Sequence, residues 1–209
     1  MFVRLALLYV GLAVFGFGIA LLVTADLGVP PWDVFHTGLA DLLGWQLGAT
    51  IVAVSFVVLV AWIPLRQRAG LGTISNAVLV GVFVDLSAHL LPADTPDSIA
   101  VRIACAAAGI GLMGVATGMY IGARFGPGPR DGLMTALAAR WWSVRTVRTA
   151  IEVSVLVAGV ALGGSIGVAT VAFALAIGPI AQLSIPYFTR LASTGPARAD
   201  VAQIVRNTG

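Results

Sequence analysis

The sequence contains no lysine, and charged residues make up only 10% of its 209 positions. A soluble domain normally carries about 25% charged residues, so this chain has too few to cover a water-facing surface. Hydrophobic residues reach 59%, which places the protein in a lipid bilayer. The formal net charge of +3 is small and comes from scattered arginines, so we expect no nucleic-acid partner.

Cysteine occurs once, as Cys105, which excludes an internal disulfide and a cysteine-based metal cluster. No combination of histidine, cysteine and carboxylate has the spacing of metal ligands, so neither a metal nor a cofactor is expected. The P-loop, the dinucleotide-binding fingerprint and the nucleophile elbow are missing as well. We therefore expect the protein not to be an enzyme and, from this chain alone, not an ATP-driven pump.

Six hydrophobic runs are long enough to cross the hydrocarbon core as helices, which takes about 20 residues. They cover residues 4–24, 47–65, 71–91, 100–122, 146–163 and 167–188. Two shorter amphipathic segments, 31–44 and 130–141, follow the first and the fourth run. A helix of about fifteen residues rises only about 22 Å, so both are predicted to be short broken or re-entrant helices.

A chain-breaking motif precedes each short segment, and the two motifs are similar. The first motif is Gly28-Val29-Pro30-Pro31-Trp32-Asp33, and the second is Gly126-Pro127-Gly128-Pro129-Arg130-Asp131. Glycine, proline and aspartate coincide at a constant offset, and further identities include Arg4 with Arg102, Gly11 with Gly109 and Thr73 with Thr170. The chain is therefore predicted to contain two repeats, residues 1–95 and 96–190, followed by a weakly ordered cytoplasmic tail, 191–209.

The arginines predict the orientation in the membrane. With a cytoplasmic N-terminus, Arg102 is the one arginine in an outer segment, and the outer segments instead hold aspartates. This asymmetry follows the positive-inside rule. Three spans per repeat place the second repeat upside down relative to the first. The predicted fold is an all-α polytopic membrane protein with six spans in a 3+3 inverted-topology repeat and both termini in the cytoplasm.

The motifs are the candidate solute site. Irregular backbone at membrane depth is tolerated only where protein or a water-filled cavity covers it, and transporters with inverted repeats bind substrates at such breaks. Gly28, Pro31, Gly126 and Pro129 are expected to shape this backbone. The alternative is an interfacial turn followed by a helix on the membrane surface.

Six side chains are predicted to bind the solute: Trp32, Asp33 and His36 from the first repeat, with Tyr120, Arg130 and Asp131 from the second. The aspartates lie in the first turns of their helices, where a carboxylate also stabilises the helix dipole. Their alternative role is therefore that of structural caps. Arg130 would suit an anionic group of the solute, and the aspartates a cationic group.

Two further acidic residues fall inside predicted spans, where ionisable groups are costly and indicate function. Asp85 lies in the third span and is our candidate for ion or proton coupling. Glu152 lies near a span end, and Arg148, four residues earlier, is expected to neutralise it.

The chain resembles the YczE/YyaS/YitT group of small bacterial integral membrane proteins. The resemblance lies in Leu27–Val34, in Gly126–Met134, and in Gly72-Thr73-Ile74 with Gly81–Asp85 downstream. It implies a multi-pass protein of the bacterial plasma membrane, and it implies no activity and no catalytic residues. The soluble C-terminal domain of the YitT-like members is not expected in this protein.

These observations favour a secondary transporter or permease for a small polar or charged solute, as a monomer or a homodimer. The alternative is an accessory or scaffold protein that assists a membrane complex without transporting anything, in which case the motif charges would be structural.

Overall fold

The computed structural model describes residues 1–92, 94–140 and 143–193, and within these ranges it contains eight helices and no strand. The helices are α1 (Phe2–Ala25), α2 (Pro31–Leu43), α3 (Leu47–Trp62), α4 (Leu71–Ala88), α5 (Ile99–Gly122), α6 (Pro129–Ala138), α7 (Val144–Ala161) and α8 (Val168–Ser193). The predicted all-helical fold is therefore confirmed. Most of the predicted tail, residues 194–209, lies outside the described part of the chain.

Four helices, α1, α4, α5 and α8, are long and apolar enough to cross a membrane. Helices α2 and α3 pass the same test only as a pair that is bent by 112°. Sequence analysis expected six spans, and the structure gives four, or five with the bent pair. Two helices account for the difference. Helix α3 has 16 residues and rises about 24 Å, and α7 carries Arg145, Arg148 and Glu152 within 18 residues.

The two short helices lie where the motifs predicted them. Each begins with a proline at its first position, Pro31 in α2 and Pro129 in α6, because a proline there needs no amide hydrogen and already has a helical φ. Gly44 ends α2 in the left-handed conformation with φ of 66°. These start and stop signals separate both short helices from the neighbouring long ones.

Helices α1 and α5 run antiparallel in close contact. A Cβ added at Gly18 would lie 3.0 Å from the Gly109 carbonyl oxygen, and one added at Gly11 would lie 3.1 Å from the backbone nitrogen of Tyr120. The glycines therefore let the two backbones approach, as small residues do between membrane helices. Buried side chains of both helices, Leu8, Leu12, Ile19, Leu22, Ile110 and Met113 among them, form the main core.

Two arginines cap this pair of helices in the same way at opposite ends. Arg4, at the start of α1, donates from Nε to the Ala123 carbonyl at the end of α5, at 2.9 Å. Arg102, at the start of α5, donates from Nε to the Ala25 carbonyl at the end of α1, at 2.8 Å. A cation at the C-terminus of a helix satisfies free carbonyl groups and favours the helix dipole.

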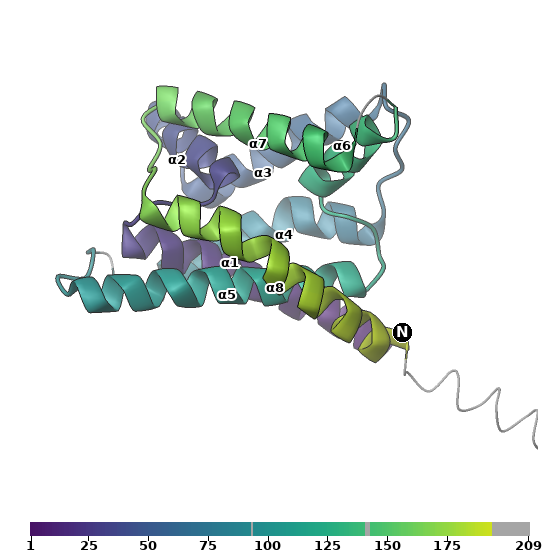
Figure 1. The fold of residues 1–209 in the computed structure, drawn as a ribbon, viewed down its shortest axis with the longest axis horizontal. Helices are drawn as coiled ribbons and strands as arrows, with labels where there is room; N and C mark the ends of the chain where they lie inside the picture. The colour runs from purple at the N-terminus through teal and green to yellow at the C-terminus, as the bar shows by residue number, and fades with distance from the viewer. Residues whose placement is uncertain (93, 141–142, 194–209) are drawn as a thin grey trace, which may run out of the picture.

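Two pairs of helices join the two halves of the sequence. In Figure 1, α2, α3, α6 and α7 lie on one side of the molecule, and α1, α5 and α8 lie on the other. Helix α2 packs against α7, and α6 packs against α3. Each short helix therefore rests on a helix from the opposite half of the chain, and the two halves interlock.

Candidate functional site

The two motif loops share a backbone conformation that requires glycine. Gly28 has a φ of 99° and Gly126 a φ of 114°, both in the left-handed region that favours glycine. A Cβ at Gly28 would lie 2.3 Å from the Gly167 nitrogen, and one at Gly126 would lie 2.8 Å from Thr73 Oγ1. The loops thus turn tightly against the start of a helix from the other half.

Two buried threonines hold these loops in place. Thr170, at the start of α8, donates from Oγ1 to the Val29 carbonyl of the first motif at 2.8 Å. Thr73, at the start of α4, donates to the Pro127 carbonyl of the second motif at 2.8 Å. Each bond joins one half of the chain to the other half, so the positions of both short helices depend on the interlocked arrangement.

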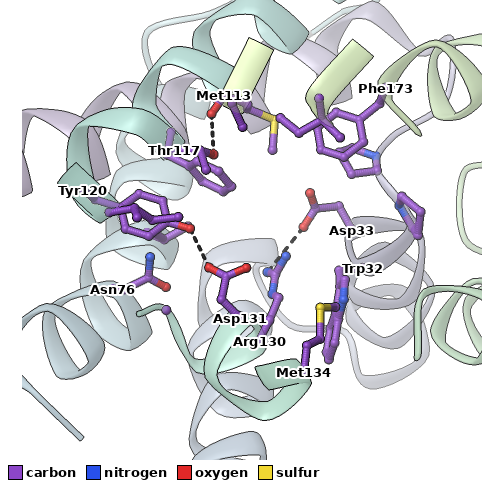
Figure 2. A pocket seen from close by; sticks show the side chains of 18 of the residues that line it. Trp32, Asp33, Asn76, Met113, Thr117, Tyr120, Arg130, Asp131, Met134 and Phe173 are labelled. Carbon is purple, nitrogen blue, oxygen red and sulfur yellow. Dashed lines mark hydrogen bonds and ion pairs between the residues drawn. The ribbon is translucent and has the colours of Figure 1, made fainter. Parts of the chain in front are cut away.

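A central cavity of about 300 Å³ lies where the two short helices begin. Five of the six predicted site residues line it: Trp32, Asp33, Tyr120, Arg130 and Asp131. Figure 2 shows Asp33 on one side of this space, with Tyr120 and Asp131 facing it from the other. Apolar side chains complete the wall, including Phe15, Ile51, Val80, Met113, Phe173 and Ile177.

Asp33 is fully buried, with 0% of the residue exposed. Its Oδ1 lies 3.0 Å from His36 Nδ1 and 3.7 Å from Nη2 of Arg130. The Arg130 guanidinium carbon lies 5.1 Å from the centre of the Trp32 ring, within the range of a cation–π contact. The first turns of α2 and α6 thus meet through a carboxylate, a guanidinium and an indole ring.

Asp131 has a different partner. Its Oδ2 accepts a hydrogen bond of 2.7 Å from the Tyr120 hydroxyl of α5. The Tyr120 ring packs edge-on against Phe15 of α1, with ring centroids 6.1 Å apart. The two aspartates occupy equivalent sequence positions, and their side-chain partners make the two sides of the cavity chemically unequal.

His36 is not among the residues that line the cavity. It is fully buried beside Trp32 and Phe35, with ring centroids 6.4 Å and 6.2 Å away. Its Nδ1 contacts Asp33, so it reaches the cavity only through that carboxylate. His36 therefore lies where it can orient Asp33, and its direct contact with a solute stays a prediction.

Asp85 lies outside the central cavity. Its Oδ1 accepts a hydrogen bond of 2.7 Å from the Gly48 amide in the first turn of α3. Together with Asp26 and His89 it borders a separate hollow. This bond satisfies a free amide at a helix N-terminus, which is a structural role, and the coupling role of Asp85 stays a prediction.

Sequence analysis missed several polar residues of the cavity: Ser55, Asn76, Thr117, Arg148, Glu152 and Gln182. The predicted pair of Arg148 and Glu152 is present, with Nε and Oε1 2.9 Å apart. The one signal for Arg148 and Glu152 in the sequence was their charge within a hydrophobic run. This signal did not indicate that both side chains lie on the side of α7 that faces α2 and α6.

Among the described residues, no group of three or more histidine, cysteine, aspartate or glutamate side chains could hold a metal ion. Asp33 and His36 form a pair without a third ligand of these types. Charged groups on both sides of an apolar space are compatible with a site for a polar solute.

A family model described as "Family of unknown function (DUF6198)" matches residues 2–186. An uncharacterized protein of Haemophilus influenzae is 34% identical over 188 residues, which are 90% of this chain and 85% of that protein. No solved structure matches the chain significantly.

Two relatives come from Bacillus subtilis. The uncharacterized membrane protein YczE is 32% identical over 198 residues, which are 93% of this chain and 91% of YczE. The uncharacterized protein YyaS is 26% identical over 186 residues, which are 87% of this chain and 92% of YyaS. These matches confirm the resemblance that the motifs predicted. The chain is a membrane protein and belongs to the DUF6198 family.

Proposed function

We propose that the protein is a secondary transporter or permease for a small polar or charged solute, which binds in the central cavity. The observation that carries this proposal is the position of Asp33. Its carboxylate is fully buried at the start of a short helix that is bent away from the next one by 112°. Ionisable groups and broken helices inside a membrane are both costly, and both are typical of transporter substrate sites.

The architecture proposed for this function is a 3+3 inverted-topology repeat, with α3 and α7 completing three spans in each half. The paired caps support it, since Arg4 binds the end of α5 as Arg102 binds the end of α1. A two-fold axis that exchanges two antiparallel helices runs perpendicular to them, which places the axis in the membrane plane. The arginine distribution supports cytoplasmic termini in the bacterial plasma membrane.

The alternative is an accessory or scaffold protein. A scaffold has no need for a cavity that brings charged residues of both halves together, whereas a transporter requires one. Since one chain supplies both sides of the cavity, a monomer is sufficient for binding. We propose no catalytic activity for this site.

The test is the access of water-soluble reagents to the cavity from each side of the membrane. Cys105→Ala removes the single cysteine, and Thr117→Cys then places a thiol on the cavity wall. A membrane-impermeant methanethiosulfonate reagent is added to right-side-out and to inverted vesicles. Leu90→Cys is the control, because Leu90 is 75% exposed beyond the end of α4.

A transporter alternates between two open states, so Thr117→Cys is expected to react in both types of vesicle. Leu90→Cys should react in one type only, since it lies at one membrane face. Reaction of Thr117→Cys from a single side, or from neither, would favour the scaffold and contradict transport.

A further inference from the structure

The cavity contains a hydrogen-bond acceptor and a hydrogen-bond donor that no described residue satisfies. Oδ2 of Asp33 and Nε1 of Trp32 are buried without a hydrogen-bond partner. Asp33 is 0% exposed and Trp32 is 8% exposed, and both line the cavity. Buried polar groups in native proteins are normally paired, so unpaired ones at a cavity wall indicate a ligand that pairs with them.

Arg130 adds a second group with free capacity beside them. Its Nη2 lies 3.7 Å from Oδ1 of Asp33, a separation that is longer than a hydrogen bond. The side chain is 21% exposed, and the cavity is the space that it borders. Arg148, by contrast, forms an ion pair with Glu152, in which Nε and Oε1 are 2.9 Å apart. Arg130 can therefore donate to an anionic group while its face stays on the Trp32 ring.

We infer that the ligand of this cavity is a small zwitterion of the α-amino acid class with an apolar side chain, an inference that rests on the proposed function. Its ammonium group donates to Oδ2 of Asp33. Its carboxylate accepts from Arg130 and from the indole N–H of Trp32. The two charged groups of an α-amino acid are neighbours on one carbon, as the carboxylate of Asp33 and the guanidinium of Arg130 are neighbours in the cavity.

The remainder of the cavity defines the rest of the ligand. Ile51, Val80, Met113, Phe173 and Ile177 line it, and these side chains suit an aliphatic or thioether chain. A volume of about 300 Å³ lies at the small end of ligand pockets. Oδ2 of the second carboxylate, Asp131, already accepts from the Tyr120 hydroxyl, whereas Oδ2 of Asp33 is buried without a partner.

Ligands with a single charge would fit less well. A simple ammonium ion would leave the N–H groups of Trp32 and Arg130 without an acceptor. A simple carboxylate would leave Oδ2 of Asp33 without a donor and would add a negative charge beside it. Only a ligand with both groups satisfies all three side chains at once.

Three probes of one shape test this on the purified full-length protein: leucine, isoamylamine, which lacks the carboxylate, and 4-methylpentanoate, which lacks the ammonium. Isothermal titration calorimetry should give leucine the highest affinity. Each analogue should bind on the order of tenfold or more weakly, the effect of losing a charged hydrogen bond. Sodium and potassium chloride serve as controls for simple ion binding.

Two substitutions should separate the two charged groups. Asp33→Asn should weaken leucine and isoamylamine but not 4-methylpentanoate, and Arg130→Gln should weaken leucine and 4-methylpentanoate but not isoamylamine. Asp41→Asn is the matched control, because Asp41 is exposed on the same helix as Asp33. Size-exclusion elution and thermal stability without ligand identify any variant that fails to fold. If a variant fails, the relative affinities of the three probes for the wild type decide whether the ligand is a zwitterion.

Equal or stronger binding of either analogue, or stabilisation by sodium or potassium alone, would overturn the zwitterion while leaving the proposed transport intact. Absence of binding by all three probes would overturn it as well. Transport itself is judged separately by two-sided labelling of Thr117→Cys, so that one-sided labelling refutes the proposed function whatever the probes do.

Discussion

Thr170→Val is a nearly isosteric change that removes the hydroxyl joining α8 to the first motif loop. In the structure this hydroxyl donates to the buried Val29 carbonyl at 2.8 Å and accepts from the Gly167 amide at 3.2 Å. Valine can do neither. The loop that positions Asp33 should therefore lose its side-chain link to the second half of the chain.

The magnitude follows from the burial of the groups left behind. An unsatisfied buried carbonyl costs about 1–3 kcal/mol, and Val29 is only 1% exposed. The half-buried Gly167 amide adds less, since solvent can reach it. The methyl group that replaces the hydroxyl stabilises the folded protein by about 0.8 kcal/mol, because it is buried and apolar. We expect a net destabilisation of about 1–2 kcal/mol, near the upper end for a single hydrogen bond inside a membrane protein.

The equivalent substitution in the other half should cost less. Thr73 makes the corresponding bond to the Pro127 carbonyl, but Pro127 is exposed, so solvent can replace the lost donor. The assay is thermal unfolding of the purified protein followed by intrinsic tryptophan fluorescence. For a chain of this length, 1–2 kcal/mol corresponds to a Tm lower by about 3–6 °C, with a smaller decrease for Thr73→Val.

Thr149→Val controls for the change of side chain, because Thr149 is exposed on α7. Its Tm should stay close to that of the wild type. The reasoning fails if Thr170→Val is as stable as this control, or if Thr73→Val is the more damaging of the two buried substitutions.

Three further predictions concern the architecture. Gly18→Ala should destabilise the protein by about 1–3 kcal/mol, since its Cβ would lie 3.0 Å from a carbonyl oxygen of α5. Gly111→Ala should be neutral in the same unfolding assay, because its Cβ would meet nothing within 4 Å. Arg4→Gln and Arg102→Gln should lower stability by similar amounts, about 1 kcal/mol each, and a large difference between them would argue against equivalent halves. Alkaline phosphatase fused after Pro92 should be active, because that loop is predicted to be outside; a fluorescent or otherwise cytoplasmic reporter active at the same point would reverse the orientation.

Sequence patterns were sufficient for the helices and for the position of the motifs. Proline at the first helical position and glycine at positive φ have local physical causes, so Pro31, Pro129, Gly28 and Gly126 could be interpreted without a fold. The repeated aspartate then indicated that two distant segments share one environment. The structure places Asp33 and Asp131 around one cavity for this reason.

The same reasoning could not predict which side of each helix faces the protein and which side faces the lipid. In a bilayer the lipid-facing side of a helix is as apolar as the protein-facing side, so hydropathy does not separate them. Arg148 and Glu152 therefore looked like an interfacial pair, although α7 turns them toward the cavity. Asp85 looked like a free intramembrane charge, although the amide of Gly48 on the neighbouring helix satisfies it.

The six spans stay a prediction, because α3 and α7 do not pass a test of length and hydropathy by themselves. Length and mean hydropathy describe a segment alone, whereas α3 and α7 lie against the short helices of the opposite half. Such packing shelters charged residues and shortens the apolar stretch that a helix needs, so α3 and α7 can be proposed as spans although neither passes that test alone.

The most direct test is counterflow of leucine in proteoliposomes that contain the full-length protein. Vesicles loaded with unlabelled leucine are diluted into trace radiolabelled leucine, and the label inside is followed over time. The wild type and Asp41→Asn should accumulate label transiently above equilibrium, whereas Asp33→Asn should remain at the level of protein-free vesicles. Equal accumulation by Asp33→Asn and the wild type would contradict a transport site built on Asp33, and no accumulation by the wild type would contradict leucine as its solute.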